Sequence, residues 1–291
     1  MNHMSCIGFA EMTQDELAQI IDRAMALAVD ESPNPSARHP RWTDSSGASL
    51  AFHVNDDGEI MCMTPFFEAP SPGCWRLRTT APADDPDCPH CGGADCDVLA
   101  PDPSEGLVTR AAIQWLHFQR YRDWLSKPHQ FACEVVAFAD RAAFCPTSEA
   151  FRAKCKECLP GIFAGGDPGA DDVPRVCGLD EVSFIPTGMF EKEHAFGARA
   201  TALFAGRVKA AKKLTNTLVD RDFWHVRVDS LPGVVDVVCC HDPETETEAD
   251  AVPELGSIAL VKGWLVGRPT EPPPHRPARN PRGWLARLFS R

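Results

Sequence analysis

Asp222-Phe-Trp-His-Val-Arg-Val-Asp229, continued by Ser230-Leu-Pro-Gly233 and Val234-Val-Asp-Val-Val-Cys-Cys240, carries the clearest structural signal of this chain. In the first segment Trp224, Val226 and Val228 share one face, and such a period of two is typical of a β-strand. The Pro-Gly dipeptide between the two segments is typical of a turn. We therefore predict a β-hairpin over residues 222–240.

The segments around this hairpin predict two more strands. One is a long strand over 199–214 with a bulge or bend at Gly206, and the other is 257–268, which follows an acidic loop at 242–254. A long bent strand, a hairpin and a closing strand resemble an OB-type barrel, so we predict an OB-like small β-barrel module over 195–268. That fold needs five strands and the pattern supplies four, so a small open sheet is the alternative.

The region 1–190 is predicted to mix helices with strands. Thr13-Gln-Asp-Glu16 is a capping box that starts an amphipathic helix over 14–29. Strands are expected at 49–54, 59–67, 74–80, 107–118 and 131–144, with a helix as the alternative for 107–118, and helices are expected at 121–125 and 147–158. The fold class is thus predicted as α+β, mainly antiparallel β, with an N-terminal helix and mixed sheet followed by the barrel module.

Residues 81–106 stand out by their charge, because they contain no Lys or Arg. Their acidic residues are Asp84, Asp85, Asp87, Asp95, Asp97, Asp102 and Glu105. With several Pro and Gly residues, this segment is predicted to be a long loop or insertion. The net charge of the whole chain, -12, argues against a general nucleic-acid coat.

The C-terminal segment 269–291 is predicted to be a proline-rich linker followed by a basic amphipathic tail. Its apolar face would hold Trp284, Leu285, Leu288 and Phe289. Such a tail could dock to an unknown protein partner or make weak contact with an anionic membrane surface. A frayed tail is the alternative, because nine residues form a marginal helix.

The cellular compartment is predicted from the cysteines and the termini. The 13 cysteines cannot all pair within the chain, and we find no signal peptide and no apolar stretch that would span a membrane. We therefore predict a cytoplasmic protein with reduced thiols.

The sequence Cys88-Pro-His-Cys91-Gly-Gly-Ala-Asp-Cys96 is the one place where side chains indicate a specific chemistry. Two thiolates at C-x-x-C spacing in a tight turn can bind the same zinc ion, so we predict a structural zinc with Cys88, Cys91 and Cys96 as ligands. Candidates for the fourth ligand are Cys74, His90 and the Cys155/Cys158 pair.

Two other interpretations of these cysteines remain open. Cys-Pro-His-Cys is identical to the active-site tetrapeptide of DsbA-like thiol oxidoreductases, but here no strand leads in and no helix leads out. The nearby carboxylates would also raise the pKa of a thiol, so we interpret the match as chance. The second interpretation is an acidic loop whose cysteines have no specific role.

A face of the predicted barrel carries basic and aromatic groups that could hold single-stranded nucleic acid. These residues are Arg207, Lys209, Lys212, Phe223, His225 and Arg227. An ordinary solvated face is the favoured alternative, because the chain is acidic overall, and we do not expect nucleic acid as a partner.

No catalytic signature occurs in the sequence: there is no G-x-S-x-G, no H-E-x-x-H, no phosphate loop and no dinucleotide fingerprint. We therefore predict a non-catalytic binding or interaction protein of unassigned ligand. The alternatives are a thiol- or zinc-dependent enzyme that uses the cysteine cluster, and a single-strand nucleic-acid binder.

Overall fold

In the computed structural model, the described part of the chain forms two β-sheets and three α-helices. The described residues are 3–9, 12–31, 38–86, 88–102, 104, 106–163, 179–190, 199–240 and 252–270. The predicted tail face of Trp284, Leu285, Leu288 and Phe289 lies outside them, as does most of the predicted acidic loop 242–254. None of the helices in these ranges has the length and apolar character needed to cross a membrane.

The smaller sheet is antiparallel and lies near the N-terminus. Its strands follow the order β1 (Val29–Asp30), β2 (Pro40–Thr43), β3 (Ala48–Val54) and β4 (Ile60–Phe67). Helix α1 (Gln14–Leu27) begins at the predicted capping box, in which the Glu16 N–H donates to the Thr13 hydroxyl and the Thr13 N–H donates to the Glu16 carboxylate. The β3–β4 hairpin is confirmed, and its turn places Gly58 at a φ of 86°, where glycine is favoured.

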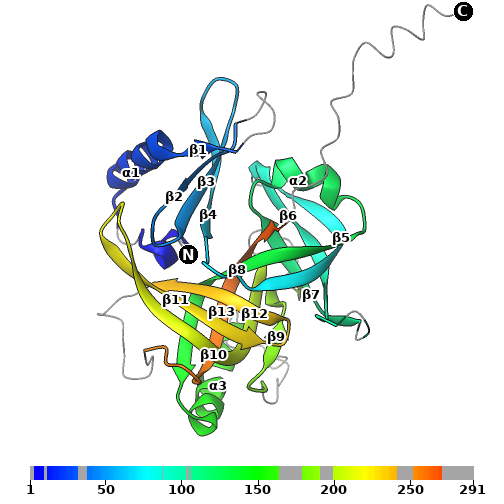
Figure 1. Ribbon diagram of the computed structural model, residues 1–291. Coiled ribbons are helices and arrows are strands. Elements are labelled where there is room, and N and C mark those ends of the chain that lie inside the picture. Colours follow the sequence, from blue (N-terminus) through cyan, green and yellow to red (C-terminus); the bar gives the residue numbers. More distant parts are fainter. Residues whose placement is uncertain are drawn as a thin grey trace, which may run out of the picture.

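The larger sheet is mixed and contains the remaining nine strands. They are β5 (Cys74–Asp85), β6 (Cys88–Leu99), β7 (Leu107–Trp115), β8 (Gln130–Cys145), β9 (Ser183–Ile185), β10 (Thr201–Asn216), β11 (Arg221–Ser230), β12 (Gly233–Cys240) and β13 (Ile258–Pro269). The order is β11-β12-β8-β5-β6-β7-β13-β10-β9, with additional pairings β10–β11 and β8–β13. Helices α2 (Phe118–Leu125) and α3 (Ser148–Phe163) complete the fold. Figure 1 shows the smaller sheet and α1 on one side, β5–β7 with α2 on the other, and α3 at the bottom.

The prediction of a loop over 81–106 is wrong, because most of this segment forms the β5–β6 hairpin. Three of its acidic side chains, those of Asp84, Asp95 and Asp97, pair with arginines of other strands and helices. Asp97 binds Arg78 of β5 and Arg110 of β7, and Asp95 binds Arg199. A local excess of acid therefore does not prevent strand formation when neighbouring strands supply arginine.

The prediction of an OB-like barrel over 195–268 is not confirmed, although each strand predicted there exists. These strands do not pair only among themselves. Strand β8, from outside the predicted module, lies between β12 and β13, parallel to the first and antiparallel to the second. The large sheet also continues through β5–β7 beyond these strands, so the four predicted strands form part of a larger mixed sheet.

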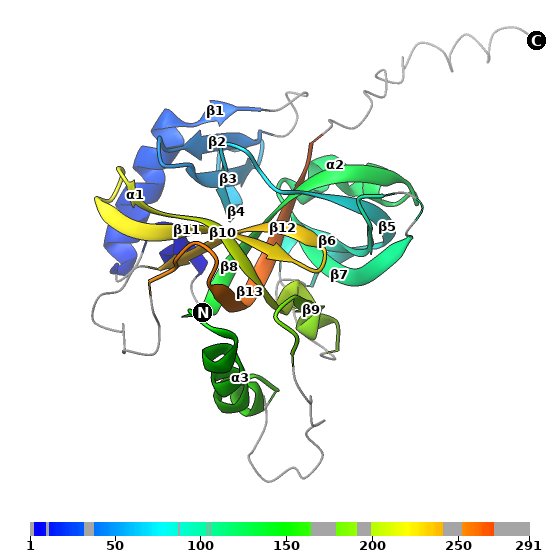
Figure 2. The same cartoon turned by 60° about the horizontal axis from the view of Figure 1, so that its bottom comes forward.

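Apolar packing joins the two sheets. One hydrophobic cluster combines Phe52 and Phe66 of the smaller sheet with Phe138, Phe223 and Trp264 of the larger one. A second cluster consists mainly of side chains from the large sheet and α2, and a third combines side chains of α3 with strands of the large sheet. In Figure 2 the smaller sheet lies above the strands of the larger sheet, in agreement with this packing.

Candidate metal centre

Three cysteines from both sheets converge at the edge of this interface. Cys62 lies on β4 of the smaller sheet, and Cys88 and Cys91 lie at the start of β6 in the larger sheet. Their sulfur atoms all lie within 4.8 Å of one another, and all three residues are partly buried. Two sulfurs that bind one tetrahedral zinc at 2.3 Å are about 3.8 Å apart, so small side-chain rotations would bring the three thiols to a common metal.

The positions of Cys88 and Cys91 follow from an irregularity at the start of β6. Asp85 of β5 pairs with Cys88, but Asp84 pairs with Gly92, so residues 89–91 form a bulge. Gly92 permits this geometry, because a Cβ there would lie 2.6 Å from the Phe118 ring and 2.7 Å from the carbonyl oxygen of Ala83. The C-x-x-C pair is thus held by a bulged strand.

The three thiols already interact with one another. A hydrogen bond to Cys62, together with burial, raises the pKa of the Cys91 thiol, and burial and a hydrogen bond to Cys91 raise the pKa of Cys88. A reactive redox thiol needs a lowered pKa, so this environment does not favour the thiol oxidoreductase interpretation. A metal ion would replace the shared protons and bind the thiolates instead.

Cys96, predicted as the third ligand, lies elsewhere. It is fully buried in the core of the large sheet, where its thiol contacts the carbonyl oxygen of Ala94 at 3.7 Å. Cys96 lies beyond the bulge, and its side chain is packed in the core of the large sheet and not beside the other thiols. Sequence spacing gave no sign of Cys62, because only the docking of the two sheets brings β4 to β6.

Of the residues predicted as a possible fourth ligand, only His90 lies beside the three thiols in the part of the chain that the structure describes. Cys74 starts β5 and is exposed, and Cys155 lies on α3, where it is buried in the third hydrophobic cluster with Phe151. The side chain of Cys158 lies outside the described residues. His90, between the two cysteines of the motif, does line the pocket beside Cys62 and Cys91.

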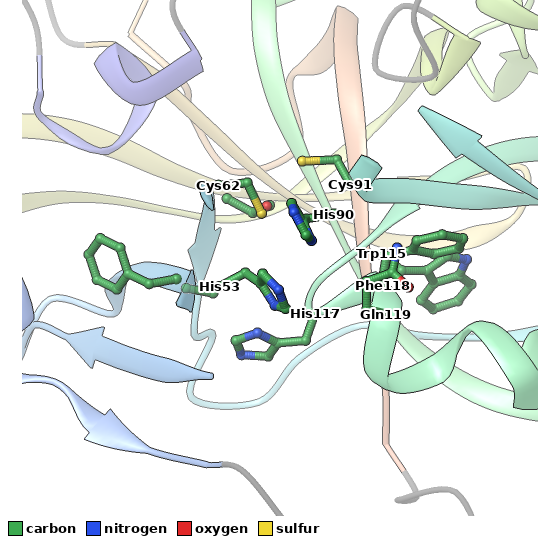
Figure 3. Close-up of a pocket in the computed structure, with 11 residues that line it drawn as sticks. His53, Cys62, His90, Cys91, Trp115, His117, Phe118 and Gln119 are labelled. Atoms are coloured by element: carbon green, nitrogen blue, oxygen red, sulfur yellow. The ribbon is translucent and has the colours of Figure 1, made fainter. Parts of the chain in front are cut away.

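Four histidines from four separate segments form a row next to the thiols. His90 stacks on His53 with ring centroids 4.5 Å apart, His53 lies 5.1 Å from His39, and His39 lies 5.1 Å from His117. His53 is the direct cross-strand partner of Cys62, so the two side chains share one face of the smaller sheet. Figure 3 shows His90 between Cys62 and Cys91 in this view, with His53 and His117 beneath them.

A small cavity lies between the thiols and the imidazoles. It is lined by His53, Cys62, His90, Cys91 and His117, among others, and has a volume of about 10 Å³. This volume suits a single water or ion. Trp115 and Phe118 form part of its wall, so the site is polar on one side and apolar on the other.

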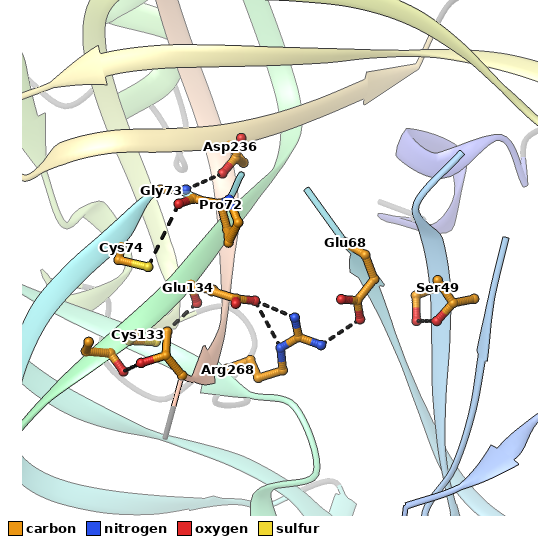
Figure 4. A network of polar contacts seen from close by, with 12 residues as sticks. Ser49, Glu68, Pro72, Gly73, Cys74, Cys133, Glu134, Asp236 and Arg268 are labelled. Atoms are coloured by element: carbon orange, nitrogen blue, oxygen red, sulfur yellow. Dashed lines mark hydrogen bonds and ion pairs between the residues drawn. The ribbon is translucent and has the colours of Figure 1, made fainter. Parts of the chain in front are cut away.

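A chain of ion pairs fixes the two sheets next to this site. Arg268 of β13 binds Glu134 of β8 at 2.5 and 3.0 Å and Glu68 at 2.7 Å (Figure 4). Arg41 of β2 pairs with Glu68 and with Glu31, and the Glu31 carboxylate lies 3.7 Å from Nε2 of His117. The charged network therefore extends from the large sheet to the imidazole row.

The residues predicted to bind nucleic acid do not form an exposed aromatic and basic face. Phe223 is fully buried, and His225 is buried against the Phe67 ring. The basic side chains Arg207, Lys209 and Arg227 pair with Glu181, Asp229 and Asp236, while Lys212 is exposed. Neither of the two aromatic rings is open to stack on a base.

No protein-family model, curated protein or solved structure matches this chain. The fold and the site define its class as a mainly β protein with a candidate three-cysteine metal centre.

Proposed function

We propose that this chain is a zinc-binding protein in which the metal joins two β-sheets, and that it acts as a non-catalytic binding or interaction protein. One observation carries the proposal: Cys62 of the smaller sheet lies within metal-binding reach of Cys88 and Cys91 of the larger sheet. Zinc fits this donor set, because thiolates are its usual ligands in structural sites.

The position of the site supports a structural role. The two sheets share no backbone ladder in the described part of the chain, so side chains alone hold them together. A bound zinc would add directional bonds at the edge of the apolar interface. Because the apolar cluster and the Arg268 ion pairs also join the sheets, we expect metal removal to loosen the smaller sheet without unfolding the whole chain.

The strand pairings also support an OB-like arrangement in which β8 supplies the missing fifth strand. β10 pairs with β11 and β13, β11 pairs with β12, and β8 pairs with both β12 and β13. In OB folds the second and third strands present the ligand-binding face, and β11 and β12 would take those places. Phe67 packs on His225 of this face, and the Gly73 N–H donates to Asp236 of the same face. Because the face is covered by other parts of the chain, a structural role is favoured over nucleic-acid binding.

A zinc-dependent enzyme is the second candidate. Three protein ligands with a fourth position next to a water-sized cavity are the arrangement of catalytic zinc sites. In the cobalt-substituted protein, a change of the visible spectrum on adding cyanide would show an exchangeable fourth ligand and favour this candidate. An unchanged spectrum would favour the structural role.

The metal content of the purified, reduced protein tests the proposal. Elemental analysis should find zinc in the wild type and a loss of the thiolate-bound ion in Cys62→Ser and in Cys88→Ser/Cys91→Ser. Cys74→Ser is the matched control, because Cys74 is an exposed cysteine on β5 away from the cluster. Zinc content that is unchanged in the Cys62 variant would refute the proposal.

A further inference from the structure

We propose that His39, His53 and His117 form a second metal site, which binds a divalent transition-metal ion such as zinc through imidazole nitrogens. This site would lie next to the thiolate site and would be independent of it. Imidazole is a ligand of zinc, copper and nickel, so the donor set defines the class of ion.

The spacing of two ring nitrogens is the first support. Nδ1 of His39 and Nδ1 of His53 face each other at 3.4 Å. Two nitrogens that bind the same tetrahedral zinc at 2.0–2.1 Å lie about 3.4 Å apart. The pair therefore already has the separation of two ligands on one ion.

His117 is the second and independent support. Its side chain is only 5% exposed and lines the cavity, yet its Nε2 has no hydrogen-bond partner among the described residues and lies 3.7 Å from the Glu31 carboxylate. Buried polar atoms without a partner are rare and often mark an ion or water site. The backbone of His117 is also left-handed, with φ 54°, an uncommon conformation for a residue other than glycine.

The protonation state of the three imidazoles suits metal binding. Burial and the neighbouring His53 and Arg120 lower the pKa of His39 to about 4. Burial, His39 and Arg120 lower the pKa of His117 to about 3, and burial and His90 lower that of His53. Each of these shifts favours the neutral ring, which offers a lone pair to a metal ion.

Charges of both signs surround the row. The positive charges of Arg120 and Arg41 act on the imidazoles, and the negative charges of Asp30 and Glu31 act on His39. Arg41 is itself neutralised by Glu31 and Glu68. Asp30 and Glu31 would therefore offset part of the positive charge of the two arginines around a bound cation.

Metal binding at this site requires a small movement. Among the described residues only the three cysteines have ligand atoms that all lie within 4.8 Å of one another. The ion would draw the His117 ring toward the His39–His53 pair, with which it already makes an edge contact through His39.

The test is the number of zinc ions bound by the full chain and by two sets of variants, measured by equilibrium dialysis and elemental analysis. We expect two ions in the wild type. We expect one ion in Cys62→Ser/Cys88→Ser/Cys91→Ser, and one ion in His39→Ala and in His117→Ala. His129→Ala is the matched control, because His129 also has an unpartnered Nε2 but lies beside Trp124, away from the row.

If a histidine variant fails to fold, X-ray absorption spectroscopy of zinc-loaded Cys62→Ser/Cys88→Ser/Cys91→Ser still tests the proposal, because it identifies the atoms bound to the zinc. We expect nitrogen neighbours at about 2.0–2.1 Å and no sulfur at about 2.3 Å. If the triple serine variant binds no zinc, the second site does not exist. A wild type with one ion that is bound by both sulfur and His53 would also overturn it, because His53 would then complete the thiolate site.

The two proposals fail separately in this design. If the serine substitutions leave the zinc content unchanged, the thiolate site is refuted while the imidazole site can still stand. If only the histidine substitutions leave the zinc content unchanged, the imidazole site alone is refuted.

Discussion

Asp236 of β12 is buried to 1% exposure and joins the start of β5 to the β11–β12 hairpin. Its carboxylate accepts the Gly73 N–H at 2.8 Å and lies 2.8 Å from Nε2 of His225, with Nε of Arg227 at 3.6 Å. We expect Asp236→Ala to lower the free energy of unfolding by about 3–5 kcal/mol, the usual loss when one partner of a buried pair is removed.

The magnitude follows from the groups that the substitution leaves behind. The Gly73 N–H and the His225 ring would each remain buried without an acceptor, at about 1–3 kcal/mol apiece. Because about 1 kcal/mol shifts the melting temperature of a chain of this size by roughly 2–4 °C, the variant should melt about 6–20 °C below the wild type.

Urea denaturation followed by tryptophan fluorescence measures this loss, with Asp229→Ala as the matched control. Asp229 lies on the adjacent strand and pairs with Lys209 at 2.9 Å, but its side chain is 45% exposed. Removal of such a surface pair should change stability by about 0–1 kcal/mol. If Asp236→Ala and Asp229→Ala differ by less than about 1 kcal/mol, the network does not stabilise the fold as argued.

Three further predictions concern other parts of the fold. Thr13→Ala removes the capping box of α1 and should cost about 1 kcal/mol in urea denaturation, whereas the neighbouring Gln14→Ala should cost almost nothing. Gly73→Ala should destabilise by about 1–3 kcal/mol, seen as a lower melting temperature, because its Cβ would lie 2.3 Å from the carbonyl oxygen of Val234. Removal of zinc by a chelator should speed amide exchange in β3–β4 and at the start of β6, and leave the β10–β11 ladder unchanged; uniform acceleration would argue against a local role for the metal.

The sequence predicts those parts of the fold whose signals are local. The capping box at Thr13, the turn at Gly58 and the alternation around Val226 each involve neighbouring residues, and the structure confirms the helix and both hairpins. The β5–β6 hairpin was missed because the groups that neutralise it are remote. Arg110, Arg122 and Arg199 are far from the acidic residues in sequence and meet them only after folding.

The candidate site divides in the same way. The spacing of Cys88 and Cys91 predicts one half of a metal centre, and the structure brings these two residues together with a third cysteine. Neither Cys62 nor the histidine row could be predicted. These residues lie on strands and connections that are distant in sequence, and no local sequence pattern indicates that the segments meet. Cys96 shows the converse error: proximity in sequence does not place a side chain on the same face of a strand.

The location of the cysteines and histidines is what makes metal binding physically reasonable in this fold. Apolar contact, which joins the two sheets through Phe52, Phe66 and Phe223, is non-directional and fixes their relative orientation weakly. The Arg268 ion pairs are directional contacts at one place of the interface. At another place Cys62 lies next to Cys88 and Cys91 of β6, and His53 stacks on His90 of the same strand. Metal–ligand bonds are short and strongly directional, so an ion there would define the orientation of the smaller sheet that apolar packing leaves free to vary.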